Sequence, residues 1–260
     1  MSLELAHIAF GEDHTGGAPV VILHGLLGSA RNWSTIARKL AAARAVFALD
    51  LRNHGGSPWA DAMTYDQMAD DARAFMARRG LPAAAVIGHS MGGKVAMRLA
   101  LAHGEKVSRL VVVDVAPVAY RRGFNAYVEA MRGLDLSGIG RRAEADAVLA
   151  EQIDDPAVRG FLLQNLVSSD AGLAWRVPLQ TLADNMPELV GFPDTPEGER
   201  YEGSTLFVTG GRSDYVRPEH HAKILRLFPN AQFAAIPDAG HWVHAEAPQK
   251  FLEVVGRFLD

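Results

Sequence analysis

A serine flanked by glycines is the first group in the chain with clear chemical potential. Residues 88–92 spell Gly-His-Ser-Met-Gly, between a stretch of strand type and a helical pattern. A Gly-x-Ser-x-Gly motif in this context presents its serine on a tight, strained turn at the tip of a sheet. Gly88 and Gly92 fit such a turn because a Cβ at either position would find no room. Ser90 is therefore the candidate nucleophile.

A serine hydroxyl attacks well only when a nearby base removes its proton, so the chain must bring a histidine to it. His241 lies in the stretch Asp-Ala-Gly-His-Trp at 238–242, between the last strand-type run and a C-terminal helical pattern. We expect His220, His221 and His244 to be solvated helix residues and to form no metal site. His241 is the candidate general base.

Two aspartates are candidates for orienting this histidine and stabilising its imidazolium. Asp214 follows one strand-type run and precedes Pro218 by four residues, while Asp114 ends the strand-type run before it. Asp214 could instead cap the helix that begins near Pro218, and Asp114 could bond loop amides at the end of its strand. The residues alone leave both open.

The oxyanion of an acyl-transfer intermediate needs hydrogen-bond donors. Residues 24–28, His-Gly-Leu-Leu-Gly, follow the first clear strand pattern with a glycine-permitted turn. We assign the donors to the backbone amides of Leu26 and Met91, the second because it follows the nucleophile at a helix N-terminus. His24 is expected to be buried and to shape this loop, and His89 to pack rather than react.

An alternating pattern of strands and helices surrounds these residues. Short β-branched runs separated by helical patterns are typical of a mostly parallel sheet that is buried on both faces. Thr64 and Gln67 form a capping-box pattern that opens a helix to about Arg79. The expected strands are 19–23, 45–49, 84–88, 110–114, 205–209 and 232–236.

This alternation stops between Pro117 and Gly203, where helical patterns follow one another. We expect a core domain at 1–117 and 203–260 and an inserted helical lid at 118–202, with helices near 121–132, 143–152, 156–166 and 175–186. An apolar acyl pocket is expected from aromatic residues of the lid and the histidine loop, although half of the lid aromatics could be lid core: Phe124, Tyr127, Phe161, Trp175 and Trp242.

Four motifs resemble those of the α/β-hydrolase superfamily, and the match spans nearly the whole chain. They are His-Gly at 24–25, Asp-Leu-Arg-Asn-His-Gly-Gly-Ser at 50–57, Gly-His-Ser-Met-Gly-Gly at 88–93 and Gly-His-Trp at 240–242. The resemblance implies an α/β-hydrolase fold, with helices flanking a mostly parallel central sheet and an inserted helical lid. It also implies that Asp50 and Arg52 form a structural pair in their loop.

A closer resemblance involves the stretches 92–97, 113–117 and 240–244, which are similar to bacterial YbfF-type esterases and the related mammalian abhydrolase domain-containing protein 11. It implies an esterase or thioesterase acting on small acyl esters. The general superfamily spacing makes Asp214 the first choice for the acid. The YbfF type favours Asp114, because those esterases have a Gly-Gly-Asn-Ser stretch without the later aspartate. Ser213 here marks the same loop, where it could touch the histidine.

Composition excludes several other classes. The 260 residues are 48% hydrophobic and 22% charged, as in an ordinary globular protein. The net charge of −4 and the lack of a dense basic run argue against a nucleic-acid partner. No apolar run approaches the roughly 18 residues of a membrane span, and the first residues do not resemble a signal peptide. The absence of cysteine suits a cytoplasmic setting. We expect a monomer or small homo-oligomer that needs no cofactor or metal.

Three rival interpretations use the same residues. Residues 88–94 also spell Gly-x-x-x-x-Gly-Lys, but Val95 stands where a phosphate-binding loop needs Ser or Thr to hold magnesium. A ligand-binding protein could use the same fold without catalysis. A carbon-carbon bond hydrolase or a cofactor-free haloperoxidase would use the same serine and histidine.

Overall fold

A seven-stranded sheet forms the centre of the molecule, in the order β1-β3-β2-β4-β5-β8-β9. The computed structural model describes residues 2–14, 16–120, 124–170 and 172–260. β1 is antiparallel to β3 and every other neighbouring pair is parallel, which confirms the mostly parallel sheet. The strands are β1 (His7–Phe10), β2 (Val20–Leu23), β3 (Val46–Leu49), β4 (Ala84–His89), β5 (Val107–Val113), β8 (Thr205–Gly210) and β9 (Ala231–Ile236).

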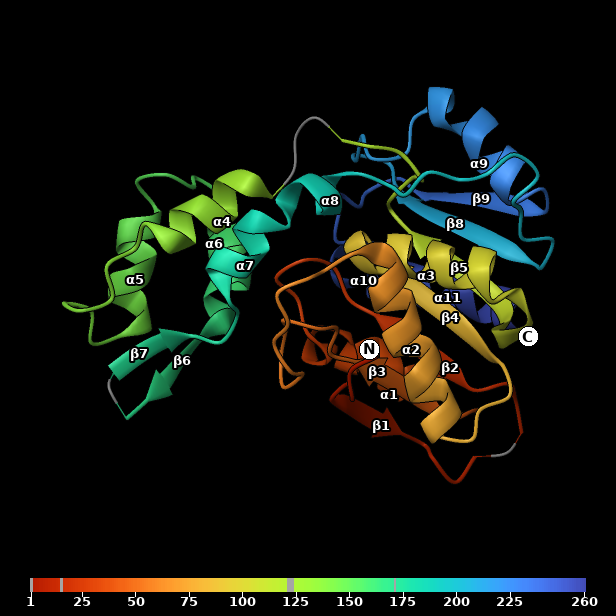
Figure 1. Ribbon diagram of the computed structural model, residues 1–260, viewed down its shortest axis with the longest axis horizontal. Coiled ribbons are helices and arrows are strands. Elements are labelled where there is room, and N and C mark those ends of the chain that lie inside the picture. Colours follow the sequence, from red (N-terminus) through yellow and green to blue (C-terminus); the bar gives the residue numbers. More distant parts are fainter. Residues whose placement is uncertain (1, 15, 121–123, 171) are drawn as a thin grey trace.

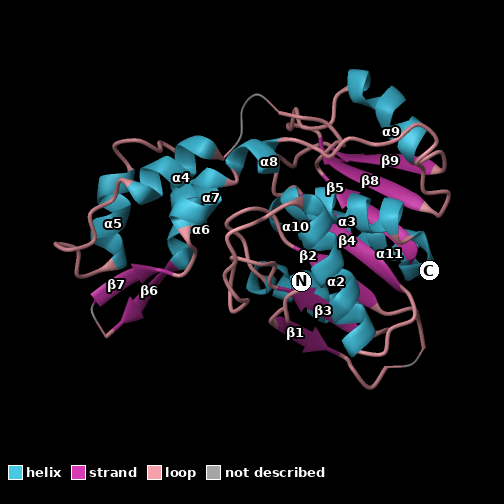
Figure 2. Cartoon of the chain, in the orientation of Figure 1, coloured by secondary structure: helices cyan, strands magenta, loops and turns pink. Residues whose placement is uncertain are grey.

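Helices cover both faces of this sheet (Figure 1, Figure 2). Because successive side chains of a strand point to opposite faces, Val21 of β2 joins one buried apolar cluster and Ile22 the other. Burying apolar surface on both faces is the main force that holds such a layered fold together. The core helices are α1 (Ser34–Leu40), α2 (Tyr65–Arg78), α3 (Met91–Ala102), α9 (His221–Leu227), α10 (Val243–Glu246) and α11 (Pro248–Leu259).

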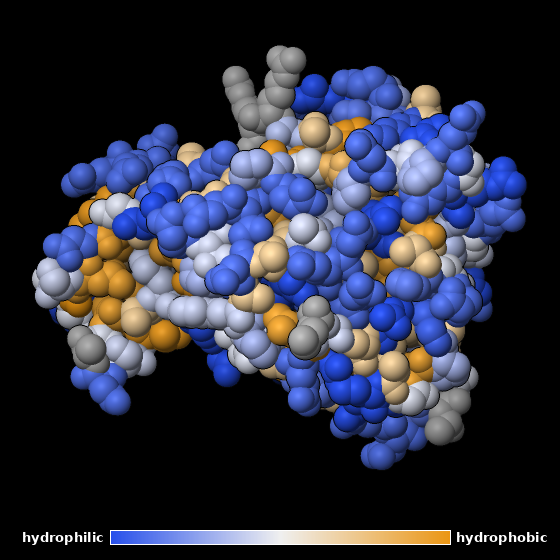
Figure 3. Space-filling view, in the orientation of Figure 1, coloured by the Kyte–Doolittle hydropathy of each residue, from blue (hydrophilic) through white to orange (hydrophobic). Residues whose placement is uncertain are grey.

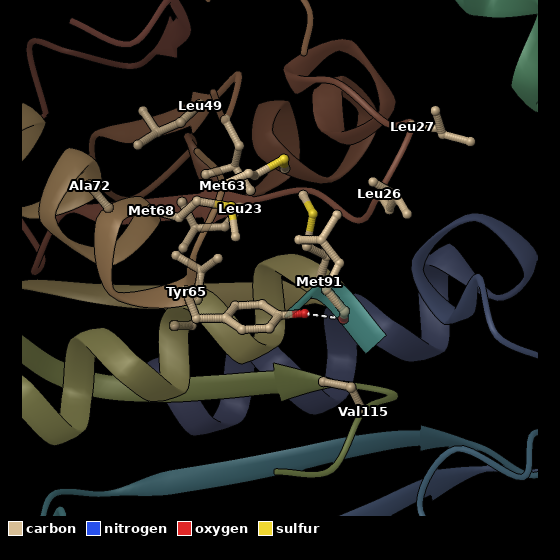
Figure 4. Close-up of a cluster of buried hydrophobic side chains, with 14 of the residues drawn as sticks. Leu23, Leu26, Leu27, Leu49, Met63, Tyr65, Met68, Ala72, Met91 and Val115 are labelled. Carbon is tan, nitrogen blue, oxygen red and sulfur yellow. Dashed lines mark hydrogen bonds between the residues drawn. The ribbon is translucent and has the colours of Figure 1, made fainter. Parts of the chain in front are cut away.

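Helix α2 begins where its capping box predicts. The Thr64 hydroxyl accepts the Gln67 amide at 3.2 Å, and the Gln67 side chain accepts the Thr64 amide at 3.1 Å. Tyr65 in the first turn donates a 2.6 Å hydrogen bond to the carbonyl of Leu189. Figure 4 shows Leu26 and Met91 together with Tyr65 in one cluster of buried side chains. The start of α2 is thus tied to the segment that returns from the insertion.

The insertion between β5 and β8 forms a lobe beside the sheet, which we call the cap (Figure 1). Apolar side chains gather over this lobe on the face shown in Figure 3. Its elements are α4 (Asn125–Arg132), α5 (Arg142–Leu149), α6 (Pro156–Leu162), β6 (Leu166–Ser169), β7 (Gly172–Trp175), α7 (Leu179–Asp184) and α8 (Met186–Val190).

Two parts of the sequence prediction differ from this arrangement. The antiparallel hairpin β6-β7 stands where the third cap helix was expected to end and the fourth to begin. Gly172 has a φ of +112°, a conformation that L side chains rarely adopt, and helical periodicity gives no sign of it. The short, partly exposed strand β1 was also not predicted. Residues 121–123 of the first expected cap helix lie outside the described residues.

Among the residues that the structure describes, no helix is both long and apolar enough to cross a membrane.

Candidate active site

Ser90 occupies the sharp turn between β4 and α3. Its φ of 52° and ψ of −118° are unfavourable for a residue with a Cβ, so the surrounding structure must hold it there. A Cβ on Gly88 would lie 2.2 Å from the carbonyl oxygen of Gly92, and one on Gly92 would lie 2.3 Å from that of Leu23. These contacts are the steric reason for the two glycines that the motif indicated.

A continuous hydrogen-bonded chain runs from Ser90 through His241 to Asp114. His241 Nε2 lies 3.0 Å from Ser90 Oγ, and His241 Nδ1 lies 2.7 Å from Asp114 Oδ2. The three residues come from separate places at one edge of the sheet: the turn after β4, the end of β5 and the loop after β9. The arrangement has the geometry of a nucleophile, its base and an orienting carboxylate.

Asp114 is completely buried, and described groups bond both of its oxygens. Oδ1 accepts the amide of Gly210 at 3.0 Å, while Oδ2 accepts the Ser213 hydroxyl in addition to His241. A buried carboxylate is costly unless it is hydrogen-bonded in this way. Ser213 thus contacts the carboxylate, rather than the histidine as suggested from sequence.

Asp214, the first choice for the acid, lies away from His241. Its carboxylate bonds Arg217 at 2.8 Å, and 79% of its side chain is exposed. The physical reason is a tight turn, closed by the Ser213 amide on the carbonyl of Gly210, in which Ser213 points to Asp114 and Asp214 to solvent. The expectation that Asp214 contacts His241 is therefore wrong.

Two buried histidines shape the loop that carries Leu26. His24 Nε2 accepts the amide of Leu51 at 3.0 Å, and His54 Nε2 accepts that of Leu27 at 3.0 Å. Leu27 has a φ of 62°, so this loop is also strained. The structure agrees with the expectation that His24 is buried and shapes the loop. Leu26 and Met91 both line the space beside Ser90, where their amides were predicted to bind an oxyanion.

Asp50 and Arg52 hold the neighbouring loop, but they do not pair with each other as expected. Asp50 accepts the amides of Ala30 and Gly56 at 2.7 and 2.8 Å. Arg52 forms a buried ion pair with Asp71 at 2.7 Å. The loop is therefore anchored at two separate points.

Ser90 lies between two cavities of very different size. The larger has a volume of about 900 Å³ and is lined by Phe124, Phe161 and Trp242 among others. Two other predicted pocket residues, Tyr127 and Trp175, line neither of these cavities. The Tyr127 ring packs edge-on against the Phe124 ring with ring centres 5.3 Å apart, and Trp175 lies on the cap hairpin. The smaller cavity measures about 40 Å³ and contacts residues that sequence reasoning missed, namely Tyr65, Lys94, Val115, Tyr120, Met186, Leu189, Val190 and Tyr215.

The surroundings of Lys94 test the interpretation of residues 88–94 as a phosphate-binding loop. Its side chain is buried, and Nζ donates to the carbonyls of Val190 and Gly191 at the end of α8. Burial lowers the pKa of this amine to about 7. The lysine therefore ties the nucleophile helix to the cap, and the phosphate-loop interpretation is wrong.

His89 and His244 pack behind the serine. His244 stacks on Trp33 with ring centres 3.9 Å apart, so the expectation of a solvated His244 is wrong. The Nε2 of His89 lies 2.8 Å from the carbonyl oxygen of His241, to which it donates. His89 thus fixes the backbone of the base, as packing rather than as a reacting group.

The chain is similar to known hydrolases in sequence and in fold. A family model described as alpha/beta hydrolase fold matches residues 18–248. A Mus musculus protein named sn-1-specific diacylglycerol lipase ABHD11 is 41% identical over 248 residues, covering 92% of this chain and 80% of that protein. Esterase YbfF of Escherichia coli (strain K12) is 34% identical over 250 residues, covering 96% of each. A solved structure described as a marine microorganism esterase is similar with a TM-score of 0.94 and 35% identity, covering 99% of this chain and 100% of that one.

Buried neutral histidines should make the protein sensitive to mild acid. Burial lowers the pKa of His24 from 6.5 to about 4 and that of His54 and His244 to about 3, and it lowers that of His89 well below 6.5. Below pH 6.5 the unfolded chain therefore binds more protons than the folded one. The free energy of unfolding should therefore decrease as the pH is lowered below about 6.5, by up to about 1.4 kcal/mol per pH unit for each histidine.

Urea unfolding at pH 7.5, 6.0 and 5.0, at constant ionic strength, measures this slope. His54→Gln should flatten it, whereas the exposed His14→Gln should leave it unchanged. Equal slopes for wild type and His54→Gln would contradict the prediction.

Proposed function

This chain belongs to the α/β-hydrolase family and is an esterase of that family; we propose that it cleaves short to medium acyl esters through Ser90, His241 and Asp114. The observation that carries this proposal is the unbroken chain of 3.0 and 2.7 Å contacts that joins the three side chains. The proposal includes small acyl esters or thioesters as substrates and a cytoplasmic location.

Each residue has one role in the proposed reaction. Ser90 Oγ attacks the ester carbonyl while His241 Nε2 takes its proton, and Asp114 stabilises the resulting imidazolium. The amides of Leu26 and Met91 bind the oxyanion of the tetrahedral intermediate. His241 then protonates the departing alcohol, leaving an acyl group on Ser90. Water activated by His241 releases the acid and restores the serine.

The two cavities suggest separate positions for the alcohol and the acyl part of the ester. The departing oxygen must lie near His241, and Trp242, the next residue, lines the 900 Å³ cavity. We place the alcohol there and the acyl group in the 40 Å³ cavity beside Leu26 and Met91. The large cavity has room for a bulky alcohol, so in this proposal the small cavity alone limits acyl length.

The proposed reaction predicts a covalent adduct. A fluorophosphonate should label Ser90 once, because Ser90 Oγ, losing its proton to His241, displaces fluoride from phosphorus while the phosphoryl oxygen occupies the oxyanion site. Intact mass and peptide mapping locate the adduct. Ser90→Ala should abolish it and His241→Ala should slow it strongly. An unlabelled wild-type protein would favour a non-catalytic ligand-binding role.

A second prediction separates the two aspartates. Asp114→Asn should lower kcat by on the order of 10⁴, because the amide no longer orients or stabilises the imidazolium. Asp214→Asn should stay within about twofold of wild type, since its carboxylate is exposed and pairs with the surface residue Arg217. Steady-state kinetics at matched folded fraction decide this. A large loss in Asp214→Asn with full activity in Asp114→Asn would reverse the assignment.

A third prediction concerns the size of the acyl and alcohol groups that the enzyme accepts. kcat/KM should fall steeply from butyryl to dodecanoyl esters of one alcohol, but little when the alcohol of an acetyl ester is enlarged. Met186→Ala, which enlarges the small cavity, should raise the dodecanoyl-to-butyryl ratio of kcat/KM. Met131→Ala, in the cap core and away from both cavities, should leave that ratio unchanged. The mouse relative is named a diacylglycerol lipase. Efficient cleavage of a diacylglycerol with long acyl chains would contradict the placement of the acyl group in the small cavity.

A further inference from the structure

Glu246, the last residue of α10, holds the backbone on both sides of His241. Its Oε2 accepts the amide of Gly240 at 2.8 Å, and its Oε1 accepts the amide of Trp242 at 3.2 Å. Those two amides belong to the residues directly before and after the histidine. One carboxylate therefore spans the peptide that carries the base.

A second anchor joins Glu246 to the loop that positions the acid. The Arg212 guanidinium donates to Glu246 Oε2 at 2.9 Å, and the Arg212 amide donates to the carbonyl of Ala239 at 3.0 Å. Arg212 precedes Ser213, whose hydroxyl bonds Asp114. The histidine loop and the acid-side loop are thus linked through Glu246 and Arg212.

We propose that Glu246 is a positioning residue that keeps His241 within reach of Ser90 and Asp114 by holding the amides of Gly240 and Trp242. This inference rests on the proposed role of His241 as the general base. The His89 bond to the His241 carbonyl restrains the same peptide from the core side. Loss of Glu246 removes the side-chain bonds to the amides of Gly240 and Trp242 on the other side of this peptide.

The requirement for precision follows from the contacts at the ring. Both ring nitrogens must bond at once, at 3.0 Å to Ser90 Oγ and 2.7 Å to Asp114 Oδ2. A shift of the loop by about 1 Å breaks this double alignment and costs about 10²-fold in rate. Glu246 is one of many residues that line the 900 Å³ cavity, so its loss should change KM for a small acetyl ester less than it changes kcat.

The test compares three substitutions in kcat and KM for p-nitrophenyl acetate. Glu246→Ala should lower kcat by about 10²-fold with KM within about threefold. Glu246→Gln, whose amide oxygen can still accept one backbone N–H, should fall in between. Asp238→Ala is the matched control, because Asp238 lies in the same loop with an ion pair to Lys250 and no bond to the loop amides. It should retain full kcat.

A second readout follows the positioning itself. The proton between His241 Nδ1 and Asp114 should give a low-field NMR signal in wild type that is shifted or lost in Glu246→Ala, under conditions where circular dichroism shows a folded protein. Full kcat in Glu246→Ala, an equal loss in Asp238→Ala, or a rise in KM alone would overturn the inference. If wild type shows no Ser90-dependent turnover, the proposed function fails, and the NMR signal alone then decides whether Glu246 holds the histidine.

Discussion

The contact between Asp114 and His241 is the interaction on which the rest of the site depends. Asp114 is wholly buried at the end of β5, so its charge must be satisfied by groups that the fold brings to it. The Gly210 amide, the Ser213 hydroxyl and the His241 ring meet this need. They come from the end of β8, the following loop and the loop after β9, so one buried carboxylate ties three chain segments together.

The residues with a strained backbone lie in or next to the proposed active site. Among the described residues, the non-glycine residues with positive φ are Leu27, Asn53, Ser90 and Asp114. Ser90 and Asp114 belong to the hydrogen-bonded chain, Leu27 directly follows Leu26, and Asn53 directly precedes His54, which accepts the Leu27 amide. Such conformations persist only where the surrounding structure overdetermines them. Here that structure is the sheet edge, with the Ser90 amide bonded to Val113 and the Asp114 amide to Val208.

Polar contacts join the cap to this rigid edge, in addition to the buried apolar cluster that the cap and the core share. Tyr65 and Lys94 donate to the carbonyls at the end of α8, and the Asn165 side chain donates to the carbonyl of Leu27. The first two contacts border the small cavity, whereas the large cavity opens between the core loops and α6. The cap therefore shapes the two sides of Ser90 unequally, which is the basis for assigning the two halves of an ester to different cavities.

The sequence by itself determined six of the seven sheet strands, the start of α2, the serine turn and the histidine loop, because each depends on local features: apolar periodicity, a capping box and glycines that sterics require. It also identified Asp114, but only as one of two aspartates. Tertiary structure alone decided between them, since the choice depends on which way the turn after β8 points Ser213 and Asp214. Tertiary structure also decided that His244 is buried, that Trp175 lies outside the cavities and that Glu246 holds the histidine loop. These features depend on contacts between segments distant in the chain or on the direction of a side chain, which residue spacing does not encode.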